Sequence, residues 1–75
     1  MEKLLEILES IKPGVDFKNS KNMIEEGLID SFDIVTIVAK INEEFDIEFS
    51  VSEVVPENFA TVETLYETIE RIKNN

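Results

Sequence analysis

Asp30 and Ser31 are the residues best suited to chemistry in this chain, because they fall where a loop is expected to meet a helix. The apolar segment that follows, Phe32–Val38, is typical of a helix. An Asp at such a junction can cap the helix, and the Ser after it then presents an exposed hydroxyl. The chain contains no His and no Cys. We therefore expect any chemistry to act through a group attached to Ser31.

An enzyme or a metal site finds little support in the sequence. Ser31 has no His to activate it as a nucleophile, and Lys40 falls on the opposite side of the expected helix. The chain has no His or Cys to bind zinc, and its acidic residues lack the spacing of an EF-hand loop. We expect no catalytic residues and no metal ligands. A phosphodiester on Ser31, in contrast, would be favoured by the dipole and backbone N–H groups of a helix N-terminus.

The charge of the chain restricts its partners. Among 75 residues, 17 are acidic and 7 are basic, which gives a net charge of -10. This charge disfavours binding to nucleic acid and favours partners with basic surfaces. Residues 1-75 are short enough for a single domain with a small core. No apolar run approaches the roughly 20 residues of a membrane span. We expect a cytoplasmic protein that does not span a membrane, and a monomer by default.

The spacing of apolar residues predicts an all-α fold, a small four-helix bundle with three longer helices and one short third helix. The first helix should end at Pro13-Gly14, and residues 15-29 should form a long loop between helices 1 and 2. The second helix should begin after Asp30 as its N-cap and run to about Phe45 or Asp46. Core positions expected in these segments are Leu4, Leu5, Ile7, Leu8, Ile11, Val15, Phe17, Met23, Ile24, Leu28, Ile29, Ile34, Ile37, Val38, Ile41 and Phe45.

Capping signals predict the last two helices. Ser50 and Glu53 have the spacing of a capping box for the short third helix, whose length Pro56 should limit. Thr61 should cap the final helix. Inward-facing residues expected here are Val54, Val55, Phe59, Val62, Leu65, Tyr66, Ile69 and Ile72.

The segment Gly27–Val35, which reads Gly-Leu-Ile-Asp-Ser-Phe-Asp-Ile-Val, resembles the acyl carrier protein family, as does Ile41–Ile47, Ile-Asn-Glu-Glu-Phe-Asp-Ile. The likeness covers nearly the whole chain and includes its acidic composition. It implies that a phosphopantetheinyl transferase attaches 4′-phosphopantetheine from coenzyme A to Ser31. The thiol of this arm would hold an acyl or aminoacyl group as a thioester. The resemblance also implies further partners with basic surfaces, namely an acyl- or aminoacyl-activating ligase and downstream transferases.

Several positions depart from the fatty-acid-synthase type of carrier, in which Gly-Ala-Asp-Ser-Leu-Asp is usual and a Glu commonly replaces Thr36. Lys40 also adds a positive charge to the second helix. D-alanyl carriers and stand-alone peptidyl carriers are more similar at Gly27–Ser31, Val51–Glu53, Phe59 and Thr61. We favour this subgroup, and a fatty-acid-synthesis carrier remains the alternative.

The neighbours of Ser31 suggest how the second helix meets partners. Asp30 would cap the helix and present Ser31. Docking residues expected on the same helix are apolar Phe32, Val35 and Ala39 and acidic Asp33, Glu43 and Glu44. The apolar stripe has two readings, since it could pack on a second neighbour within the fold or dock a partner. A different functional class, a non-covalent acidic helical interaction module, also fits the composition.

Overall fold

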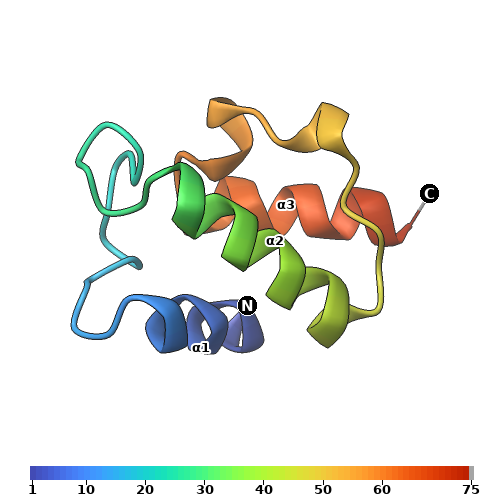
Figure 1. The fold of residues 1–75 in the computed structure, drawn as a ribbon, viewed down its shortest axis with the longest axis horizontal. Helices are drawn as coiled ribbons and strands as arrows, with labels where there is room; N and C mark the ends of the chain where they lie inside the picture. The colour runs from blue at the N-terminus through green and yellow to red at the C-terminus, as the bar shows by residue number, and fades with distance from the viewer. Residues whose placement is uncertain (75) are drawn as a thin grey trace.

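Three α-helices and two short 3-10 turns make up the computed structural model, which describes residues 1–74 (Figure 1). The elements are α1 (Glu2–Ile11), α2 (Ser31–Phe45), η1 (Val51–Glu53), η2 (Pro56–Phe59) and α3 (Val62–Lys73). The described residues contain no strand. The expected all-α class is therefore confirmed. Within residues 1–74 no helix is long and apolar enough to cross a bilayer.

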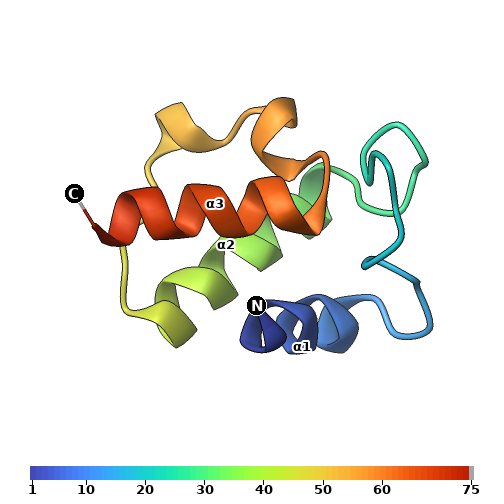
Figure 2. The same cartoon turned by 180° about the vertical axis from the view of Figure 1, so that it is seen from behind.

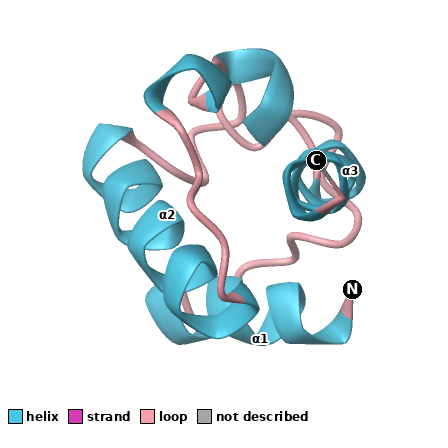
Figure 3. Ribbon diagram, turned by 90° about the vertical axis from the view of Figure 1, so that its right-hand side faces the viewer, coloured by secondary structure: helices cyan, strands magenta, loops and turns pink. Residues whose placement is uncertain are grey.

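The helices enclose a single apolar core. Viewed from either face, α2 and α3 cross in separate layers (Figures 1 and 2), and the side view places α1 beneath them and the two turns above (Figure 3). Ile37 and Ile41 of α2 are completely buried at its centre. The other buried apolar side chains come from every part of the chain, namely Leu4, Ile7, Leu8, Phe17, Met23, Ile29, Phe49, Phe59, Val62, Leu65 and Ile69.

The long loop between α1 and α2 is held against the core, as its apolar residues predict. Phe17, Met23 and Ile29 are buried, and the backbone N–H of Met23 donates to the carbonyl of Ala60 at 2.7 Å. The Met23 carbonyl in turn accepts the N–H of Leu28 at 2.9 Å. The first bond joins the loop to the segment that precedes α3, and the second closes a turn within the loop. The residues that precede α2 are therefore held against the core.

Two 3-10 turns occupy the place of the expected short third helix, so a fourth α-helix is not confirmed. Ser50 makes no capping bond to the backbone and instead shares a hydrogen bond with Ser52. Glu53 forms an ion pair with Arg71 of α3 and accepts a side-chain hydrogen bond from Asn58. A proline disfavours helical dihedrals in the residue before it. Val55 is accordingly extended, with φ −129° and ψ 153°, and separates the two turns.

The expected inward orientation is wrong for Val54, which is 36% exposed. Phe59 is completely buried, as predicted, and its ring packs at 5.7 Å from that of Phe49. Phe49 lies in the irregular segment after α2, where its N–H donates to the Asn42 side chain at 2.8 Å. The segment between α2 and η1 is therefore joined to α2 by a side-chain bond.

Helices α1 and α2 run antiparallel and are joined at both ends by lysines. Near the start of α1, the Lys3 ammonium donates to the carbonyl of Glu44 at 2.7 Å and lies 5.4 Å from the centre of the Phe45 ring. At the other end, Lys12 Nζ lies 3.2 Å from Asp33 Oδ2. These contacts set the direction of α2 relative to α1.

Replacing Met23 by Ala tests how much the loop depends on its buried anchor. Because Met23 is fully buried, we expect the free energy of unfolding to fall by about 2–5 kcal/mol. Urea denaturation followed by far-UV circular dichroism measures it. The control is Val51→Ala, which truncates a side chain that is 89% exposed and should change stability by no more than about 0.5 kcal/mol. Equal effects of the two substitutions would contradict the anchoring role.

Candidate functional site

The first turn of α2 is defined by a reciprocal capping box between Asp30 and Asp33. The backbone N–H of Asp33 donates to Asp30 Oδ1 at 2.9 Å, and the N–H of Asp30 donates to Asp33 Oδ2 at 3.1 Å. Asp30 has extended dihedrals, with φ −122° and ψ −173°. The helix therefore begins at Ser31, with Asp30 as its N-cap, as the sequence predicts. The capping role of Asp33 was not predicted from the sequence, where Asp33 is expected only at the docking surface.

The backbone before the cap depends on a glycine. Gly27 has φ +72°, a backbone conformation that residues with a Cβ rarely adopt. Its N–H donates to the carbonyl of Ile24 at 3.1 Å, which closes a turn. Ile29, two residues later, is buried. This turn and the buried Ile29 lead the chain into the capping box.

Ser31 is exposed at this helix start. Its hydroxyl has no hydrogen-bond partner among residues 1–74, and it differs in this from every other Ser and Thr described. The remaining hydroxyls all bond within the chain, at Ser10, Ser20, Thr36, Ser50, Ser52, Thr61, Thr64 and Thr68. The Ser31 oxygen can therefore accept a large substituent without breaking an internal bond.

The charge of Asp30 is stabilised by its position. The donated N–H of Asp33, and secondarily the nearby Lys12 ammonium, hold the pKa of Asp30 below its usual value, although desolvation offsets part of this effect. Asp30 is therefore a carboxylate at neutral pH. A negative charge at a helix N-terminus interacts favourably with the helix dipole.

An apolar surface extends from Ser31 along α2. Phe32 and Val35 are 84% and 68% exposed, and Ala39 is also exposed. The stripe they form therefore does not pack within the fold. Beside it lies an apolar groove of about 250 Å³, lined by Ile34, Val35, Val38, Val51 and Val54.

The two residues from the η1 region, Val51 and Val54, were not predicted to face this surface. In the sequence, Val51 and Val54 lie three positions apart, and this spacing places both side chains on one side of a 3-10 turn. The groove therefore has walls from two elements far apart in the sequence.

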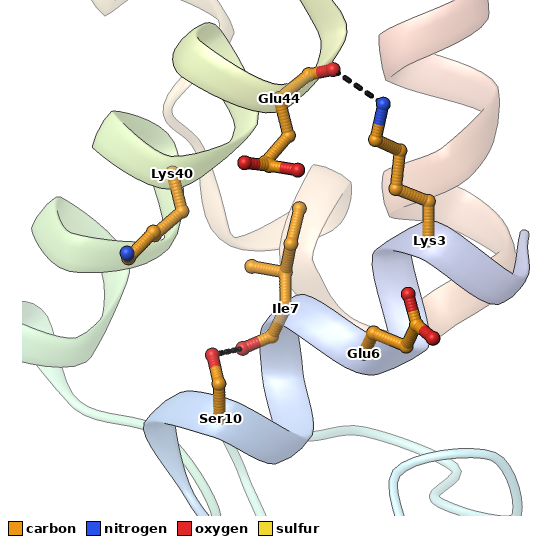
Figure 4. A pocket seen from close by; sticks show the side chains of 6 residues that line it. All are labelled: Lys3, Glu6, Ile7, Ser10, Lys40 and Glu44. Atoms are coloured by element: carbon orange, nitrogen blue, oxygen red, sulfur yellow. Dashed lines mark hydrogen bonds between the residues drawn. The ribbon is translucent and has the colours of Figure 1, made fainter.

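The three acidic residues expected at the docking surface lie on different sides of α2. Glu43 is exposed about 40° from Ala39 around the helix axis, on the same side as the apolar stripe. Asp33 is half-buried in the capping box. Glu44 faces α1, where its carboxylate points toward Ile7 (Figure 4). Of these residues, the structure brings only Glu43 together with the apolar stripe.

The cavity that contains Glu44 is separate from Ser31. It measures about 180 Å³ and is lined by Lys3, Glu6, Ile7, Ser10, Lys40 and Glu44 (Figure 4). Lys40 belongs to this side of α2, opposite Ser31, as the helical spacing predicts. No group of three or more His, Cys, Asp or Glu side chains within residues 1–74 is arranged to hold a metal ion.

Comparisons with known proteins agree with this arrangement. Residues 2–69 match the protein family described as a phosphopantetheine attachment site. The chain is also similar to D-alanyl carrier proteins of Bacillus cereus and Bacillus anthracis. Identity to each is 31% over 74 residues, which cover 96% of this chain and 94% of the relative. Both the family and the D-alanyl subgroup suggested by the sequence motifs are thereby supported.

The pH dependence of stability tests the charged cap. Because the pKa of Asp30 is lower in the folded chain than its ordinary value of 3.8, its contribution is present above that value and is lost as the pH falls through the folded-state pKa. Asp30→Asn keeps a capping side chain but has no charge. We expect the wild type to have the higher Tm at pH 7 and the difference to vanish in acid. Thermal melts from pH 7 to about pH 2 measure this. A difference independent of pH would contradict the charged cap.

Proposed function

The chain belongs to the phosphopantetheine attachment site family, whose prosthetic group is covalent 4′-phosphopantetheine, and from this premise we propose that Ser31 carries that arm. The protein then holds acyl or aminoacyl groups as thioesters and moves them between partner enzymes. The observation that carries this assignment is the exposed hydroxyl of Ser31, which is free of internal hydrogen bonds where the other described Ser and Thr hydroxyls are bonded. Asp30 presents this hydroxyl by fixing the first residue of α2.

Attachment requires a separate transferase and coenzyme A. The Ser31 oxygen forms a bond to the phosphorus that bears the pantetheine group of coenzyme A. The bond from that phosphorus to the bridging oxygen breaks, and adenosine 3′,5′-bisphosphate leaves. The hydroxyl proton passes to a base on the transferase, because no side chain of the described chain hydrogen-bonds to Ser31. The residues of this chain therefore position the acceptor and supply no base.

The cargo that we propose is an aminoacyl group, with D-alanine as the first candidate. The similar proteins of both Bacillus species are D-alanyl carriers, and the departures at Thr36 and Lys40 make α2 less acidic than in the fatty-acid type. An aminoacyl-activating ligase would then load the arm. A fatty-acyl cargo is the alternative within the same family.

The docking surface that we propose combines apolar contact with negative charge. Phe32, Val35 and Ala39, with the neighbouring groove, supply exposed apolar area beside Ser31. Burial of such area drives association. Glu43 supplies charge for a basic partner surface. We assign Asp33 to the cap and Glu44 to the contact with α1.

The setting of this function is also a proposal. Residues 1–75 act as one carrier domain, monomeric and cytoplasmic, where the ligase and coenzyme A are available. The acidic charge of -10 increases the rate of encounter with basic partners.

Substituting Ser31 by Ala tests the attachment site. After incubation with coenzyme A, magnesium and a broad-specificity phosphopantetheinyl transferase, intact mass spectrometry should show one added phosphopantetheinyl group on the wild type and none on Ser31→Ala. Far-UV circular dichroism should show equal helix content, because the Ser31 hydroxyl makes no internal bond. Ser10→Ala is the matched control and should be modified like the wild type. An unmodified, folded apo wild type would favour a non-covalent interaction module.

Reversing the charge at Glu43 tests the docking surface. We expect Glu43→Lys to raise the KM of an aminoacyl-activating ligase for the holo-carrier by about three- to tenfold with little change in kcat, because it repels a basic partner. The effect should shrink at high salt. Glu67→Lys, an equal charge change at an exposed position of α3, is the control. Equal KM values for the two variants would show that net charge alone matters.

A further inference from the structure

We propose that Lys12 is a positioning residue for modification of Ser31, an inference that rests on the proposed function. Lys12 Nζ lies 3.2 Å from Asp33 Oδ2, and the same carboxylate oxygen accepts the backbone N–H of Asp30 at 3.1 Å. Lys12 thus contacts the capping box that fixes the residue before Ser31. It acts through Asp33 and does not contact the Ser31 hydroxyl.

The ion pair between Lys12 and Asp33 connects two segments of the fold. Lys12 is the C-cap of α1, and its backbone N–H donates to the carbonyl of Leu8 at 2.9 Å. Immediately after it, the chain enters the long loop that returns at Asp30. The ion pair therefore joins the start of the loop to its end. It restricts how far the first turn of α2 can move relative to α1.

The ion pair is partly shielded from solvent. The Lys12 side chain is 39% exposed and that of Asp33 is 16% exposed. Partial burial reduces screening by water and salt, so the attraction is stronger than in an open surface pair. The only other ion pair in the part of the chain described joins Arg71 to Glu53, away from α2. Among residues 1–74, Lys12 is therefore the one cation in ion-pair contact with the first turn of α2.

The reaction itself increases the need for this cation. Attachment converts a neutral hydroxyl into a phosphodiester with one negative charge, next to the carboxylates of Asp30 and Asp33. The chain as a whole is already at -10. Like charges at short range raise the free energy of the product and of the transition state that leads to it. Lys12 acts against this repulsion through Asp33, whose carboxylate it partly neutralises while it holds the capping box in place.

Three variants separate positioning from the change in net charge. Lys12→Met removes the ammonium, Lys12→Arg keeps a cation, and Lys18→Met makes the same charge change at an exposed loop position. With a broad-specificity transferase and saturating coenzyme A, we expect kcat to fall by about two- to fivefold in Lys12→Met alone. Lys12→Arg should restore most of this loss. A change in KM that comes from the altered net charge should be the same in Lys12→Met and in Lys18→Met.

Amide hydrogen exchange on the unmodified proteins gives a readout that needs no transferase. The Asp33 N–H, which donates to Asp30, should exchange faster in Lys12→Met than in the wild type, while Lys18→Met should leave it unchanged. Exchange at the buried Ile41 should stay the same in all variants. Equal kcat and equal Asp33 exchange in the two Met variants would overturn the proposal.

A double-mutant cycle covers the case in which Lys12→Met fails to fold. Asp33→Asn removes the charge that Lys12 contacts but keeps an oxygen that can accept the Asp30 N–H. It should reduce kcat by less than Lys12→Met does, because it also removes one carboxylate beside the new phosphodiester, and Lys12→Met added to it should cause no further loss. Additive losses, or a wild-type kcat in Asp33→Asn, would contradict the inference. A wild-type chain that is never modified would contradict the proposed function instead, while the exchange comparison would still test the Lys12 contact.

Discussion

The two hydrogen bonds exchanged by Asp30 and Asp33 fix the residue at which α2 begins. They make Ser31 the first residue of α2, where its side chain is exposed. The same bonds satisfy backbone groups that a helix N-terminus otherwise leaves unpaired. The capping box thus gives the Ser31 hydroxyl a defined position in a chain of only 75 residues.

The rest of the fold supports this one position. Buried Ile37 and Ile41 hold α2 against the core, and Lys3 and Lys12 join its two ends to α1. The loop that precedes it is anchored at Met23. The side of α2 that bears Ser31 is left uncovered, with Phe32 and Val35 exposed to solvent. A carrier needs this combination, since its modified residue must be accessible to several enzymes while its helix stays in place.

Local signals in the sequence predicted much of this arrangement. The cap at Asp30, the span of α2, the cap at Thr61 and the buried face around Ile37 all depend on residues within a few positions of one another. Features that depend on distant residues were missed. The pairs Lys12–Asp33 and Glu53–Arg71 join separate elements, and the chain offers too many possible partners for spacing alone to select them.

One misplaced feature had a local signal in the sequence. Pro56 restricts Val55 to extended dihedrals, which divides the expected short helix into two turns. Glu44, whose expected docking role stays a prediction, lies about 220° around α2 from Ser31.

The most direct test of this account is to locate the phosphopantetheinyl group within the modified protein. Fragmentation of the intact holo-protein by tandem mass spectrometry assigns the added mass to a residue. The group should lie on Ser31 and on none of Ser10, Ser20, Ser50 and Ser52, whose hydroxyls are engaged in internal hydrogen bonds. A group on any other residue would contradict it, because the capping box would then present a hydroxyl that the transferase does not use.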